Sequence, residues 1–358
     1  MNASAAHPLS RRMLLAALAA VGVGAVVAFV GWQRARDQWF ASYLLAWQYW
    51  AGFSLGSLSV LLLHNITGGA WGEPVRPALR AAIATLPLVA LLFLPVALRP
   101  QEIYEWADPY HVGEDPILAH KARYLNVDAF RIRAAIYFGL WFLLQLLVAW
   151  QRRRTFVRGE RAERRLRRWS GQGLALHGLA LTFAAVDWIM SLEPHWFSAI
   201  FGVIWFASHG LAALALGIAM ASTSAEMRAA GPQDPGRDAL YDLGKLLLAF
   251  VMFWAYVSFS QFFIIWSGNL PEEVVWYAKR FEGGWGDLAL ALVALHFVAP
   301  LVLLLGRDFK REPRLLGPLA VGLVVVHWLD ALWQVGPTAS DRRIWLDAGL
   351  TLGVGGLW

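Results

Sequence analysis

The sequence contains no cysteine and few charged residues. Without cysteine the chain has no disulfide, thiolate metal site or cysteine-ligated iron–sulfur cluster. Charged residues make up 16% of the chain and hydrophobic residues 58%, whereas a soluble domain carries about a quarter charged residues. This composition excludes an ordinary soluble enzyme and a disordered chain, and it favours an integral membrane protein.

Long apolar runs recur along the chain, each about the length that crosses a bilayer as a helix. They are too long, and alternate too little, for the strands of a membrane barrel. The sequence therefore predicts an all-α polytopic membrane protein with about ten transmembrane helices. The predicted helices cover residues 13–32, 39–63, 81–98, 132–150, 171–192, 196–221, 243–266, 285–305, 315–335 and 344–358. The first run is too long for a signal peptide, so we expect a retained helix. We expect the last run to be the truncated start of a further membrane helix.

Lysine and arginine predict the orientation, because they are enriched in cytoplasmic loops. The segment 151–169 holds nine arginines, which places it in the cytoplasm. By alternation the N-terminus and the loops at 64–80, 222–242 and 306–314 share that side, which then holds 20 of the 31 lysines and arginines when Lys245 is assigned to it. The positive charge, net +6, is thus a topology signal and does not indicate a nucleic-acid partner.

Ionisable side chains inside the predicted helices are the first functional candidates, because an ionised group at mid-bilayer costs at least about 2.5–3.5 kcal/mol. Together they supply titratable groups at successive depths, as a proton path requires. The candidate path comprises His64 and His177 near the cytoplasmic face, His209, Tyr256, His296 and His327 near the middle, and Asp187 and Asp330 near the outer face. Each histidine has an alternative interpretation as a neutral imidazole bonded to a neighbouring helix.

Two spacings refine this picture. His327 and Asp330 are three residues apart, so they share one helix face and suit proton exchange. Gly52 and Gly56 form a small-residue pair that predicts close packing on another helix.

Quinone and haem binding are alternative uses of these residues. A quinone site needs an apolar pocket with a polar group at headgroup depth, and the candidates are Asp187, His195 and Asp330. Repeated histidines on one helix, as in two-haem cytochromes b, do not occur; a single haem between His209 and His296 or His327 stays an alternative. There is no HExxH motif and no Walker loop. We expect this chain to hold no redox cofactor of its own.

Several long strings carry a resemblance to a known family. They are 64–72 (HNITGGAWG), 120–126 (HKARYLN), 130–138 (FRIRAAIYF), 187–198 (DWIMSLEPHWFS) and 253–261 (FWAYVSFSQ). In this order they resemble the ActF family of membrane subunits of bacterial alternative complex III, which is related to the NrfD/PsrC-type quinone-interacting membrane proteins. The resemblance extends from about residue 39 to 335.

The resemblance implies two four-helix bundles with flanking helices. The corresponding parts would be an N-terminal helix and loop in 1–38, the first bundle in 39–195, the second in 196–335 and the start of a last helix in 336–358. It implies a place in the bacterial inner membrane, within a complex that oxidises quinol for respiratory or photosynthetic electron transport. The implied partners are a multi-haem cytochrome c and an iron–sulfur protein, which carry the redox centres, and an ActC-like membrane subunit.

Three functions remain open at this stage. The chain could contribute a transmembrane proton path without a redox cofactor, bind quinone from the membrane pool directly, or act as a structural scaffold of the complex. A secondary transporter is a further alternative, which would require matched discontinuous helices in two halves of the chain.

The predicted orientation can be tested with a tag inserted near Gly159, inside the arginine-rich segment. Because this segment is predicted to be cytoplasmic, the tag should resist a membrane-impermeant label in intact cells and react after permeabilisation. Labelling in intact cells would reverse the whole topology, since alternation places every other loop.

Overall fold

The computed structural model is all-helical throughout the residues that it describes, which are 8–155, 159–224, 227, 229, 231, 234–338 and 342–358. Eight helical segments in these ranges are long and apolar enough to cross a membrane. The prediction of a polytopic all-α membrane protein is confirmed. The helices are α1 (Pro8–Arg34), α2 (Arg36–Thr67), α3 (Arg76–Ala84), α4 (Leu86–Leu92), α5 (Leu94–Leu98), α6 (Pro109–Glu114), α7 (Pro116–Lys121), α8 (Val127–Thr155), α9 (Gly159–Trp188), α10 (Phe201–Thr223), α12 (Pro235–Gly268), α13 (Pro271–Phe281), α14 (Trp285–Leu292), α15 (Ala299–Leu305), α16 (Arg307–Arg311), α17 (Pro313–Val335) and α18 (Ile344–Leu357).

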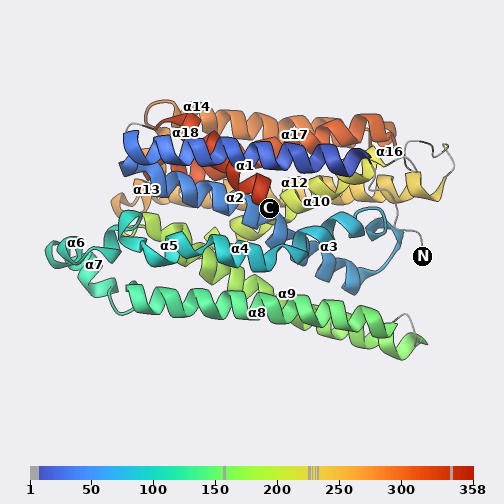
Figure 1. Cartoon of the computed structure of the whole chain (residues 1–358), viewed down its shortest axis with the longest axis horizontal. Coiled ribbons are helices and arrows are strands. Elements are labelled where there is room, and N and C mark those ends of the chain that lie inside the picture. The colour runs from blue at the N-terminus through green and yellow to red at the C-terminus, as the bar shows by residue number, and fades with distance from the viewer. Residues whose placement is uncertain are drawn as a thin grey trace.

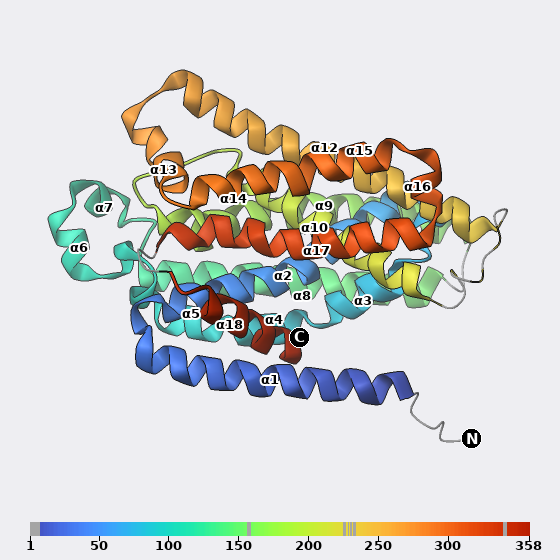
Figure 2. The same ribbon diagram turned by 90° about the horizontal axis from the view of Figure 1, so that it is seen from above.

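Two predicted helices lie outside these eight. α2 is 32 residues long and is buried on all sides from Phe40 to Leu62, apart from Trp50 at its edge. It runs through the centre of the bundle and contacts α3, α9, α10, α17 and α18. α18 is an apolar helix of 14 residues, packed between α1 and α2 (Figures 1 and 2).

Glycines bring α2 and α10 into close contact, as the small-residue pair predicts. A Cβ on Gly56 would lie 1.9 Å from the backbone oxygen of His209, so only a hydrogen fits there. α1 meets α18 in the same way, because a Cβ on Gly24 would lie 2.2 Å from the Cα of Gly353. Backbone-to-backbone approach through small residues is how membrane helices gain packing energy where there is no hydrophobic drive between them.

Prolines break two of the predicted helices. The predicted helix 81–98 consists of α3, α4 and α5, which are separated at Thr85 and Phe93, two residues before Pro87 and Pro95. Tyr43 and Trp47 of α2 donate hydrogen bonds to carbonyl oxygens next to the second break, at 2.7 and 2.9 Å. Side chains of the neighbouring helix thus bond backbone groups that the bilayer could not.

The predicted helix 285–305 is broken differently. Between α14 and α15 it forms a π-helical turn, Val293–Val298. Pro300 lacks the N–H that would bond the carbonyl of His296 four residues earlier, which accounts for an irregular ladder at this point. The turn carries His296, whose side chain is buried.

The loops gather at two ends of the bundle in the alternation that the sequence predicts. In Figure 1 the junction between α8 and α9, α16 and the N-terminal end of α1 lie at one end, and α6, α7 and α13 lie at the other. Of the nine arginines in 151–169, Arg158 and the side chains of Arg152–Arg154 lie outside the described residues.

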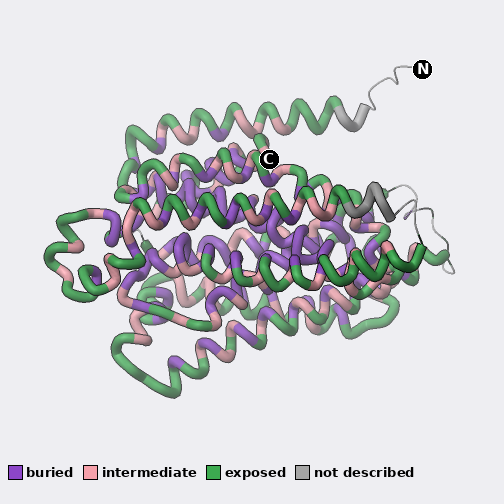
Figure 3. Tube along the Cα trace, turned by 90° about the horizontal axis from the view of Figure 1, so that it is seen from below, coloured by how far each residue is buried: buried purple, intermediate pink, exposed green. Residues whose placement is uncertain are grey.

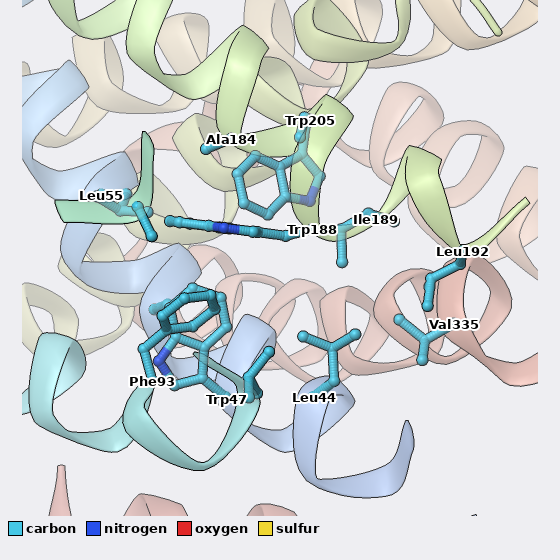
Figure 4. Close-up of a cluster of buried hydrophobic side chains, with 14 of the residues drawn as sticks. Leu44, Trp47, Leu55, Phe93, Ala184, Trp188, Ile189, Leu192, Trp205 and Val335 are labelled. Atoms are coloured by element: carbon cyan, nitrogen blue, oxygen red, sulfur yellow. The ribbon is translucent and has the colours of Figure 1, made fainter. Parts of the chain in front are cut away.

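Tryptophans at helix ends divide into two groups. Trp150, Trp169 and Trp266 are exposed, as expected of amphipathic rings at the headgroup level of a bilayer. Trp188 and Trp196 are instead buried in the core. Figure 4 shows Trp188 between Trp205 on one side and Phe93 and Trp47 on the other.

Buried residues run along the inner helices through the middle of the molecule (Figure 3). α8 packs on α9, which packs against α2, and α10 packs on α12 and α17. α2 and α10 in turn contact each other along their lengths. The division into two four-helix bundles therefore stays a prediction.

Candidate functional site

A buried polar cluster lies where α10 and α17 meet α2. Ser208 Oγ donates a hydrogen bond of 2.6 Å to Asp330 Oδ2 and lies 3.2 Å from His327 Nδ1. All three side chains are buried. The predicted pair on α17 is thus joined through a serine from the neighbouring helix, which places a hydroxyl bridge between carboxyl and imidazole.

Ser208 can bridge Asp330 and His327 in either protonation state of the carboxyl group. With an ionised Asp330, the Ser208 hydroxyl donates a hydrogen bond to the carboxylate and accepts one from His327 Nδ1–H; with a protonated Asp330, the carboxyl can donate to Ser208 and Ser208 to the lone pair of His327 Nδ1. His327 Nε2 is buried without a hydrogen-bond partner in the described part of the chain.

His209 stands beside His327 with both ring nitrogens unpartnered among the described residues. The two rings are 5.6 Å apart between centroids. Their Nε2 atoms both lie within 3.1 Å of the point where a Cβ on Gly52 would stand. Native proteins rarely leave buried polar atoms without a partner, and such atoms indicate water, an ion or a moving proton.

The cluster continues through two glutamines toward the end of the bundle that carries α13. Gln334 Nε2 donates to Asp330 Oδ2 at 3.1 Å, and Gln48 Nε2 donates to Gln334 Oε1 at 2.9 Å. In the described residues no lysine or arginine forms an ion pair with Asp330. The carboxyl group is therefore held by neutral donors, and its charge can change with the transfer of a single proton.

Arg280 of α13 lies at this end of the series of polar groups. Its guanidinium is fully buried and donates to the backbone oxygens of Trp276, Trp333 and Gln334, the last at 2.5 Å. It stacks over the Trp276 ring at 3.2 Å. Burial lowers the pKa of Arg280 to about 9, so the group remains a cation at neutral pH.

Asp187 does not belong to this cluster and is hydrogen-bonded by side chains of α8. Its carboxylate accepts two hydrogen bonds from Arg133, at 2.8 and 3.0 Å, and a third from Tyr137 at 2.7 Å. Arg133 also lies 3.9 Å from the ring of Tyr124. Because its charge is neutralised and its oxygens are bonded, Asp187 is a structural tie between α8 and α9 in this geometry.

The remaining candidates, His177, His64 and His195, each have separate partners. His177 bonds Ser59 at 2.8 Å, and His64 bonds the backbone oxygen of Gly69 at 3.0 Å. His195 bonds Asp115 at 2.5 Å and thereby fastens α7 to the turn after α9. This hydrogen bond holds the pKa of Asp115 below its usual value.

The three quinone candidates therefore have different partners. Asp187 bonds Arg133 and Tyr137, His195 bonds Asp115, and Asp330 bonds Ser208 and Gln334. The structure does not bring these three residues together in one site.

Two mid-membrane candidates do not join the cluster by a hydrogen bond. His296 packs on Trp254, with ring centroids 4.1 Å apart, and its Nδ1 is unpartnered among the described residues. Tyr256, expected on an inward face, is 68% exposed on the outer surface of α12. The expectation that Tyr256 faces the interior is therefore wrong; the periodicity of an apolar helix gives too little contrast to identify its buried face.

Sequence reasoning missed the groups that connect the cluster. Ser208, Gln334 and Gln48 are uncharged, so they are not among the ionisable candidates, and Arg280 lies between the predicted helices 243–266 and 285–305. A signal for two of them was present, since Ser208 precedes His209 and Gln334 follows Asp330 by one helical turn.

Chemically, the cluster can move one proton without changing its net charge. The state with a protonated carboxyl and neutral His327 and the state with carboxylate and imidazolium have the same total charge, so neither leaves an unbalanced ion in the membrane. His209 offers the next acceptor. The described residues contain no group of three or more histidine, aspartate or glutamate side chains arranged to hold a metal ion.

No protein-family model matches this chain, and a search of curated proteins finds no match.

The tie between Arg133 and Asp187 predicts a strong non-additivity. Replacing Arg133→Met alone leaves a buried carboxylate unpaired and should destabilise the protein by roughly 3–5 kcal/mol. The double variant with Asp187→Asn removes both charges and should recover much of that loss. Thermal unfolding in detergent measures both effects. Arg123→Met, at an exposed position, is the control; if Arg133→Met is no more harmful than Arg123→Met, the tie contributes nothing.

Proposed function

We propose that this chain is the proton-conducting membrane subunit of a quinol-oxidising electron-transfer complex of the alternative complex III type. In this proposal the chain has no redox cofactor, and His327, Ser208 and Asp330 carry protons through the middle of the bundle. The all-helical, apolar architecture supports the membrane part of the proposal.

The main support for the proton path is the series of buried polar groups that extends from His209 to Gln48. It combines a carboxyl group without a cationic partner, a hydroxyl bridge and histidine nitrogens without partners. A purely structural role would favour the arrangement at Asp187, where every charge is neutralised. The contrast between the two aspartates separates a group held for packing from one free to exchange a proton.

The place in a respiratory or photosynthetic complex rests on the resemblance of the strings described above. The proposed partners are a multi-haem cytochrome c, an iron–sulfur protein and an ActC-like membrane subunit, with the quinone pool supplying quinol in a bacterial inner membrane. In that arrangement the N-terminus lies in the cytoplasm. The separate partners of Asp187, His195 and Asp330 do not favour a direct quinone site in this chain.

Co-purification tests membership in the complex. The chain, tagged and extracted in mild detergent, should bring with it c-type haem absorbance and an iron–sulfur resonance that co-migrate with quinol oxidation activity. Purification of the chain without any redox-active partner, under conditions in which the membrane retains that activity, would contradict the proposal.

Asp330→Asn tests the proton path within the purified complex. The amide keeps the shape of the carboxyl but cannot accept a proton at neutral pH, so protons moved per electron in proteoliposomes should fall severalfold while the complex still assembles. Ser208→Ala removes the bridge and should have the same effect.

Tyr256→Phe is the matched control, because this hydroxyl lies on the outer surface, and it should leave proton movement unchanged. If Asp330→Asn fails to assemble, Ser208→Ala decides the question. Unchanged proton movement in an assembled variant lacking the carboxyl or the bridge would identify the cluster as structural.

A further inference from the structure

A cleft of about 1350 Å³ lies between the last turns of α8 and the first turns of α9. These helices run side by side at one edge of the molecule (Figure 1). The cleft is distant from the polar cluster in the chain and is not used by the proposed path. Its lining residues are Leu147, Trp150, Gly159–Arg161, Ala162, Arg164–Leu166, Arg168, Trp169 and Gln172.

The lining changes character along the hairpin. Leu147 and Trp150 of α8 and Trp169 and Gln172 of α9 line the part of the cleft that is farther from the α8–α9 junction. Tryptophan rings prefer the headgroup level of a bilayer. Between the two tryptophans and the α8–α9 junction, arginines of α9 line the cleft. The cleft therefore has an apolar part toward the membrane and a cationic part toward water.

Several arginines in the cationic part have no acidic partner among the described residues. Arg164 pairs with Glu160 at 3.3 Å, but Arg161, Arg165 and Arg168 form no ion pair with any described residue. All three are exposed. Guanidinium groups bind phosphate in a bidentate manner and are less strongly hydrated than ammonium groups, so this set suits a phosphodiester.

We propose that this cleft is a binding site for an anionic phospholipid. The phosphate of the lipid lies between Arg161, Arg165 and Arg168, the glycerol region lies at the level of Trp150 and Trp169, and the acyl chains run along Leu147 into the bilayer. A free phosphate would use the cationic part alone and leave the apolar part empty. A basic pocket between membrane helices is the kind of site that selects anionic headgroups.

The test compares lipids that differ in headgroup charge and share acyl chains. The purified, delipidated protein is incubated with phosphatidylglycerol or phosphatidylcholine, and the retained lipid is counted by native mass spectrometry. Phosphatidylglycerol should be retained and phosphatidylcholine should not. At about 1 kcal/mol for each arginine near the lipid surface, the triple variant Arg161→Gln/Arg165→Gln/Arg168→Gln should bind phosphatidylglycerol about 100-fold more weakly at low salt.

The variant Arg11→Gln/Arg12→Gln/Arg314→Gln is the charge-matched control. It removes three exposed arginines outside the cleft and should retain the lipid. Equal retention of both lipids by the native protein, or equal loss in the two triple variants, would overturn the site. Inorganic phosphate that displaces phosphatidylglycerol at comparable concentration would show a soluble-anion site and overturn the lipid assignment. If the triple variant does not fold, the lipid comparison and Arg165→Gln alone decide.

Discussion

The close approach of α2 to α10 is the constraint on which the rest of the structure depends. At Gly56 the backbones touch, and at Gly52 two histidine rings occupy the space that a side chain would fill. Any larger residue at these positions would push α10 away and separate His209 from α17. The same packing buries α2 on almost every side, which is why Gln48 and Ser59 reach partners on α17 and α9.

The absence of water from the bilayer interior decides how each buried polar group is used. Asp187 has an arginine and a tyrosine, so its charge is balanced and its oxygens are occupied. Asp330 has a serine and a glutamine, which both donate to its Oδ2 without balancing a charge. The two aspartates have the same chemistry, and their neighbours alone give one a balanced charge and leave the other without a cationic partner among the described residues.

Backbone irregularities lie beside the polar features. The break before Pro95 is bonded by side chains of α2, and the π-helical turn near Pro300 presents His296 to the interior. Irregular helix in a membrane survives where protein groups replace the lost ladder bonds. Neighbouring helices thus stabilise these irregular positions. The irregular positions in turn place polar groups inside a bundle of otherwise apolar helices.

The sequence by itself determined the class of the protein, the approximate helices and the shared face of His327 and Asp330. Composition, run length and helical periodicity are local properties, and lipid-facing apolar runs need no tertiary information. Only the tertiary structure decided that Ser208 bridges the pair, that Arg133 neutralises Asp187 and that Tyr256 faces outward. Those outcomes depend on which helix lies opposite and how it is rotated. In a helix that is apolar on every face, the sequence carries too little contrast to determine that rotation.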